Sequence, residues 1–96
     1  MRLILVMVAA AVSSGACDAK PVACRDEAGH DTAAIYVSDC MLYSLATHPP
    51  CNDANPCWMI VKEVVRSCEL PVPGAPDPKL CALYRNLQKR YPPQAG

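Results

Sequence analysis

The clearest pattern of hydrophobic and polar positions lies in the middle of the chain. Apolar residues and cysteines recur there at intervals of three and four residues, the period of one helix face. They are Cys57, Ile60, Val61, Val64, Val65 and Cys68. Asn55 is a good N-cap and Pro56 suits the first helical position. The pattern predicts a helix over residues 56–69, although its β-branched residues make a strand the competing assignment.

A second helix is predicted over residues 31–47. Asp31 or Thr32 can cap its start, and the pair Pro49–Pro50 is expected to end it. Its apolar residues form a wide band rather than one stripe. A helix that is apolar over so much of its surface is expected to lie between other elements.

A third helix is predicted over residues 78–91, where Asp77 precedes Pro78 in the same capping arrangement. Its expected buried stripe is Leu80, Leu83, Tyr84, Leu87 and Tyr91. The predicted fold class is all-α, with the first two helices as an antiparallel hairpin and the third packed across it. Residues 17–30 are expected to form an extended arm tied down by Cys24, and residues 92–96 a disordered tail.

The N-terminus has the pattern of an export signal. An unbroken apolar run, Leu3–Val12, follows Met1 and Arg2 and leads into small residues. A run of this length is too short to span a bilayer, which takes about 20 apolar residues. Residues 1–16 are therefore predicted to be a signal peptide, cleaved after Ala16 or after Ala19, and residues 17–91 to be a single domain.

Cysteine content indicates how so small a domain is stabilised. The chain has 96 residues and seven cysteines, and about 80 residues remain once the signal is removed. A core of that size is marginal without staples, so an exported, disulfide-stapled protein is expected, either secreted or periplasmic. Cys17 stands apart from the other six cysteines. It is either removed, free or paired between chains, or it carries the lipid of a bacterial lipoprotein.

The six remaining cysteines are spaced almost symmetrically, with 15, 10, 5, 10 and 12 residues between them. For a hairpin of the first two helices this spacing favours the pairs Cys24–Cys81, Cys40–Cys68 and Cys51–Cys57. The main alternative pairs Cys24 with Cys68 and Cys40 with Cys81. Six cysteines allow fifteen pairings, so the choice depends on the hairpin model.

The loop Cys51-Asn52-Asp53-Ala54-Asn55-Pro56-Cys57 resembles the central cysteine loop of attractins, small secreted molluscan pheromones. The resemblance covers these seven residues, while the flanking cysteine spacings differ and the third helix has no counterpart. It implies that two antiparallel helices with nested disulfides are a reasonable arrangement for this chain.

Charge and reactive residues limit the function further. The net charge is zero, without the basic excess typical of nucleic-acid binding. His30 and Asp31 form the only acid–base pair that suggests catalysis, and the simpler interpretation is a polar approach to a helix that Asp31 caps. The sequence has no paired CxxC, phosphate loop or Ser-His-Asp set. We therefore expect no metal, no cofactor and no enzymatic activity.

Binding of a protein partner is the function that the sequence favours, as in secreted signalling proteins, toxins and inhibitors. Trp58 is the only tryptophan, and after Pro78 the chain has four basic residues and no acidic one. The candidate partner-binding residues are Trp58, Arg85, Lys89 and Arg90. The alternative is an envelope lipoprotein with a structural or exclusion role, which contacts a membrane through a lipid on Cys17.

Overall fold

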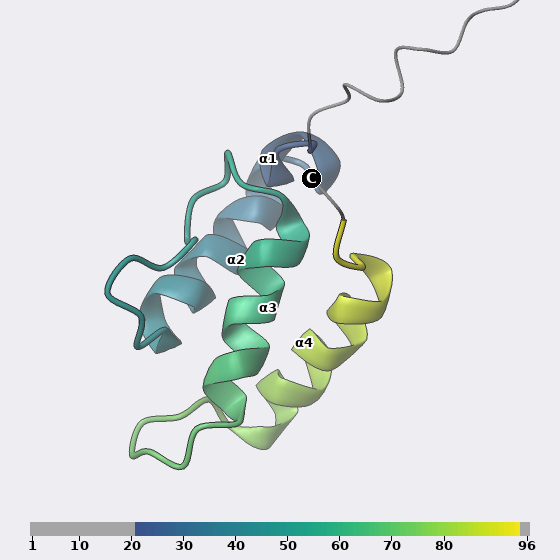
Figure 1. The fold of residues 1–96 in the computed structure, drawn as a ribbon. Helices are drawn as coiled ribbons and strands as arrows, with labels where there is room; N and C mark the ends of the chain where they lie inside the picture. Colours follow the sequence, from purple (N-terminus) through teal and green to yellow (C-terminus); the bar gives the residue numbers. More distant parts are fainter. Residues whose placement is uncertain (1–20, 95–96) are drawn as a thin grey trace, which may run out of the picture.

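The computed structural model describes residues 21–94, which contain four helices and no strand (Figure 1). They are α1 (Cys24–Glu27), α2 (His30–Tyr43), α3 (Cys57–Cys68) and α4 (Pro78–Arg90). The predicted all-α class is confirmed. The expected signal peptide, Cys17 and the last two residues of the tail lie outside the described residues.

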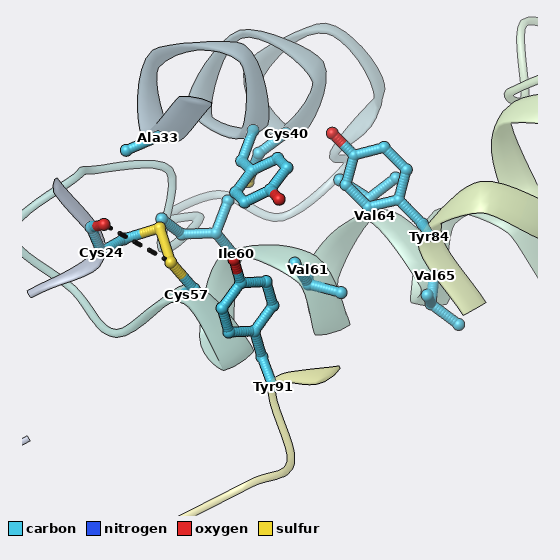
Figure 2. Packing of buried hydrophobic residues seen from close by; sticks show 11 residues of the cluster. Cys24, Ala33, Cys40, Cys57, Ile60, Val61, Val64, Val65, Tyr84 and Tyr91 are labelled. Carbon is cyan, nitrogen blue, oxygen red and sulfur yellow. Dashed lines mark hydrogen bonds between the residues drawn. A yellow bond between two sulfur atoms is a disulfide. The ribbon is translucent and has the colours of Figure 1, made fainter. Parts of the chain in front are cut away.

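Helix α3 is the centre of the fold, with α2 on one side and α4 on the other (Figure 1). Its predicted apolar stripe is buried, and Ile60, Val61 and Val64 are completely inaccessible. Figure 2 shows the rings of Tyr84, from α4, and of Tyr91, just after this helix, packed close to these side chains. Each large apolar side chain buried in this way contributes about 1.5–3 kcal/mol relative to an exposed one.

The hairpin of the fold is formed by α3 and α4, not by the first two helices. Helices α2 and α3 both run away from α1, and residues 44–56 return the chain between them (Figure 1). Backbone bonds hold the end of this return segment against α1: the Cys24 N–H donates to the Asn55 carbonyl at 2.8 Å, and the Arg25 N–H to the Asp53 carbonyl at 3.1 Å. Because α3 begins beside α1, it cannot run antiparallel to α2.

The predicted disulfide pairing was wrong, and so was its main alternative. The bonds are Cys24–Cys57, Cys40–Cys51 and Cys68–Cys81. The first joins the starts of α1 and α3, the second ties α2 to the return segment, and the third links the α3–α4 hairpin near its connection. Only Cys40–Cys51 is nested inside another bond. The prediction of fully nested bonds failed because it assumed that the first two predicted helices form the hairpin, whereas the hairpin is formed by α3 and α4.

Several helix ends differ from their predicted positions. Helix α2 begins at His30 after Gly29, whose φ of 91° favours glycine, so neither Asp31 nor Thr32 is its cap. It ends at Tyr43, well before the prolines, since Ser44 turns to extended backbone. The Ser44 hydroxyl donates to the Glu63 carboxylate at 2.6 Å and accepts the Ala46 N–H at 3.1 Å. This side chain ties the end of α2 to α3.

The starts of the other helices give one confirmation and two corrections. Asp77 caps α4 as predicted, since its carboxylate accepts the backbone N–H groups of Lys79 and Leu80 at 2.8 and 3.0 Å. Pro56 is the N-cap of α3 rather than its first helical residue, and Asn55 does not cap the helix, because its side-chain amide donates to the Pro50 carbonyl instead. The arm before His30 is not extended throughout: Cys24–Glu27 form the short helix α1.

Candidate functional site

One face of α2 is apolar and exposed. Ile35, Met41, Leu42 and Leu45 on or just after this helix are 60–69% exposed. Ile35, Met41 and Leu42 occur at helical spacing along one side of α2, with Asp31, Ala34 and Ser38. This side of the helix, with Leu45 just after it, is here called the α2 outer face. Ala33, Tyr36 and Cys40 on the opposite side are buried in the core. The expectation that this helix lies between other elements was wrong, because only one side of it is covered.

A groove of about 760 Å³ runs beside the α2 outer face. One wall is formed by Ala34, Val37, Ser38, Met41 and Leu42, and the other by Asn52 and Asp53 of the return segment. The Cys40–Cys51 bond holds this segment next to the helix. The Arg25 guanidinium donates to the Asp53 carboxylate at 3.1 Å and fixes the far wall to α1. The apolar face is thus presented by a covalently stapled frame.

Charges around the α2 outer face are mainly acidic. Helix α2 contains no lysine or arginine, and Asp31 lies at the start of the exposed side. Asp26 and Glu27 of the neighbouring α1 are also exposed. Arg25 is the only basic residue of α1, and it is already paired with Asp53. A segment that covers this face therefore meets an acidic border.

The predicted partner-binding residues lie on another surface. Trp58, Arg85 and Lys89 line one groove of about 460 Å³ between α3 and α4, here called the α3–α4 groove. Arg90 does not line it, and its guanidinium carbon lies 5.8 Å from the centre of the Tyr91 ring. Lys62, which the sequence analysis did not select, also lines the groove, with its Nζ 5.9 Å from the centre of the Trp58 ring. The i, i+4 spacing of these two residues on a helix could have indicated the contact.

A cluster of three tyrosines joins α2 to α4. The Tyr36 ring meets those of Tyr84 and Tyr91 edge to face, with 6.0 Å between centroids in each pair. The Tyr84 hydroxyl donates to the Asp39 carboxylate at 2.6 Å. Burial, with this carboxylate as the second cause, raises the pKa of Tyr84 well above its ordinary value. Burial, followed by the neighbouring Tyr91 phenol, raises the pKa of Tyr36 to about 12. The cluster belongs to the core.

The geometry does not bring His30 and Asp31 together as an acid–base pair. Both residues are exposed in the first turn of α2. Adjacent positions on a helix point about 100° apart and do not face each other. Among residues 21–94, no group of three histidine, cysteine or acidic side chains could hold a metal ion. In the same part of the chain, no helix is long and apolar enough to cross a bilayer.

No protein-family model, curated protein or solved structure matches this chain. The fold itself defines a small, disulfide-stapled, all-α protein. Two of its surfaces are candidate binding sites, the α2 outer face and the α3–α4 groove. Sequence reasoning selected three residues of the second surface and missed the first. The available signal was the wide apolar band of residues 31–47 in a chain too short to cover all of it.

Proposed function

We propose that this protein is exported and acts without catalysis, by binding a partner protein through the α2 outer face. The observation that carries the proposal is the exposure of four large apolar side chains, three on one side of α2 and the fourth, Leu45, just after it. Contiguous exposed apolar surface is unusual on monomeric proteins and marks interaction sites. Three disulfides favour a site of action in an oxidising compartment, outside the cytosol.

The partner segment best suited to this face is an amphipathic helix with basic residues at its edges. Its apolar side would cover Ile35, Met41, Leu42 and Leu45, which a helix contacts at positions spaced by three and four residues. Its basic residues would meet Asp31 and the exposed acids of α1. Complementary charge of this kind aligns a partner and accelerates association more than it adds affinity.

Export is expected to produce a shortened chain with every disulfide formed. Intact mass spectrometry of the protein from its producing cells should give a chain that starts at Cys17 or Lys20. Alkylation without reduction should leave the six cysteines of the domain unmodified, since all six are bonded. A diacylglycerol adduct on Cys17 would assign the protein to the envelope lipoproteins instead. A mass that still includes Met1 would contradict export.

Binding at the α2 outer face is expected to give site-specific cross-links. A photoreactive benzoylphenylalanine in place of Leu42 should link the protein to a partner when the producing cells are irradiated. Replacement of Ala82, an exposed residue of α4 outside both grooves, is the matched control. Both positions are exposed, so neither change should alter stability by more than about 0.5 kcal/mol.

Three outcomes of the cross-linking experiment separate the alternatives. An adduct at Leu42 that is absent at Ala82, and that Met41→Lys abolishes, supports the proposal. An adduct of twice the mass of the chain would identify a second copy as the occupant and contradict a separate partner. Equal adducts at both positions, or none at either, would also contradict it.

A further inference from the structure

The α3–α4 groove carries a second inference, independent of the α2 outer face. Its first wall consists of Trp58, Lys62 and Val65 of α3, which follow one another at helical spacing, and of Glu69 at the end of this helix. Arg85, Gln88 and Lys89 of α4 stand opposite, and no residue of α2 takes part. Because the Cys68–Cys81 bond joins the two helices, the walls are held at a set distance. The groove is therefore a built feature of the hairpin.

The charge of this groove is unbalanced. Lys62, Arg85 and Lys89 are exposed along it, and Glu69 is the only acidic residue in its lining. Within residues 21–94 the ion pairs are Arg25–Asp53 and Glu63–Arg66. The three cations of the groove therefore have no carboxylate partner in that range. Three positive charges, one on the α3 wall and two on the α4 wall, favour an anionic ligand.

Trp58 adds an apolar surface and an unused hydrogen-bond donor. Its side chain is half-buried at the groove, and its Nε1–H is buried without an acceptor among residues 21–94. A buried donor without a partner is unfavourable, and most native structures provide one. Because this N–H is inaccessible, a ligand in the groove contacts the Trp58 ring rather than the donor. Val65 and the Trp58 ring would contact an apolar part of such a ligand.

We propose that the α3–α4 groove binds an acidic peptide segment of a partner protein, with carboxylates at Lys62, Arg85 and Lys89 and an apolar side chain on Trp58. A peptide fits better than the other large anions. Nucleic acid binding requires a long row of cations, whereas this chain has zero net charge and three cations around one groove. A peptide also supplies carboxylates and an apolar side chain together.

The test uses the only tryptophan of the chain, which lies in the groove itself. The oxidised protein is titrated with a blocked peptide that has one leucine between two pairs of glutamates, and Trp58 emission is recorded. The change in Trp58 emission should reach a plateau as the peptide concentration rises. Raising the salt concentration should weaken the binding, because the electrostatic attraction is screened. A peptide with glutamines in place of the glutamates is expected to produce no saturable change.

Charge reversal tests the position of the site. Lys89→Glu should raise the dissociation constant at least ~10-fold, because one attraction is lost and a repulsion is introduced. Lys79→Glu is the matched control, since Lys79 is an exposed cation of the same helix outside the groove, and it should leave the constant within ~3-fold. Circular dichroism should show that both variants keep the helical fold.

Competing ligands distinguish the proposal from a general anion site. Inorganic phosphate at equal ionic strength, and vesicles that contain an anionic phospholipid, are titrated in the same way. The proposal requires that neither saturates the signal in the concentration range of the peptide. A response to phosphate or vesicles as strong as the response to the peptide would overturn it. An equal loss in the Lys79→Glu and Lys89→Glu variants, or equal binding of the glutamine peptide, would also overturn it.

Discussion

Complete reduction of the three disulfides is expected to unfold this protein under conditions in which the oxidised chain is folded. The loop-closure estimate gives about 3.7 kcal/mol for Cys24–Cys57, whose cysteines are 33 residues apart. It gives about 2.8 kcal/mol for Cys40–Cys51 and about 2.9 kcal/mol for Cys68–Cys81, with separations of 11 and 13 residues. The combined effect is comparable to the whole stability of a small domain, which is about 5–15 kcal/mol.

Far-ultraviolet circular dichroism before and after reduction measures this effect. The helical signal should be lost when reductant is added and should return on reoxidation. Single pairs replaced by alanine should rank by loop length, so that the chain without Cys24 and Cys57 is the least stable in urea. An unchanged helical spectrum after full reduction, with six free thiols shown by alkylation, would contradict the stapling argument.

Alkaline pH is expected to destabilise the fold through the tyrosine cluster. The pKa values of Tyr36 and Tyr84 are raised in the folded protein from an ordinary value of 10.0, and that of Tyr36 rises to about 12. The unfolded chain therefore loses these protons first. The stability contributed by the two phenols is complete below pH 10 and falls above it, through pH 12 for Tyr36 and beyond for Tyr84. The expected slope is about 1.4 kcal/mol per pH unit for each tyrosine.

Urea unfolding of the oxidised protein at a series of pH values tests this expectation. Tyr36→Phe should remove about half of the slope, because only one shifted phenol remains. Tyr84→Phe should also do so, after an initial loss of about 1–3 kcal/mol at neutral pH because Asp39 loses its donor. Brief exposure and return to pH 8 should restore the midpoint, which shows that the disulfides survived. A midpoint that stays constant between pH 9 and pH 12 would contradict the prediction.

Local features of the sequence predicted α3 and α4 well. The stripe from Cys57 to Cys68 has one period and one buried side, and Asp77 with Pro78 marks the start of α4 without ambiguity. Both signals act between residues a few positions apart, so no knowledge of the fold is needed. The end of α2 was less predictable, because it depends on the contact between Ser44 and Glu63 of α3.

The direction of α2 relative to α3 could not be obtained in the same way. Residues 44–56 are long enough either to turn sharply or to run back along α2, and the cysteine spacings agree with both. The choice is made by the bonds that join Cys24 and Arg25 to the return segment, between residues far apart in the sequence. The predicted disulfides were wrong for this reason.

The two candidate surfaces differ in the same way: one is formed by residues of helices adjacent in the chain, and the other depends on contacts between distant parts of it. Trp58, Arg85 and Lys89 meet because α3 and α4 form a short hairpin, which follows from their adjacency in the chain. The α2 outer face was missed because its exposure depends on what the rest of the fold leaves uncovered. An apolar helix side looks the same in a sequence whether it faces a core or a partner.

The disulfide order sets a condition on how this chain can mature if it is exported from its N-terminus. Of the six disulfide-bonded cysteines, Cys24 and Cys40 emerge first, yet they are not bonded to each other in the folded protein. Oxidation of these two thiols to each other would therefore produce a non-native bond. The native pattern requires that Cys24 stays reduced until Cys57 has emerged, or that thiol–disulfide exchange replaces the first bond afterwards. The fold thus links the arrangement of its first helices to the thiol chemistry of the compartment it enters.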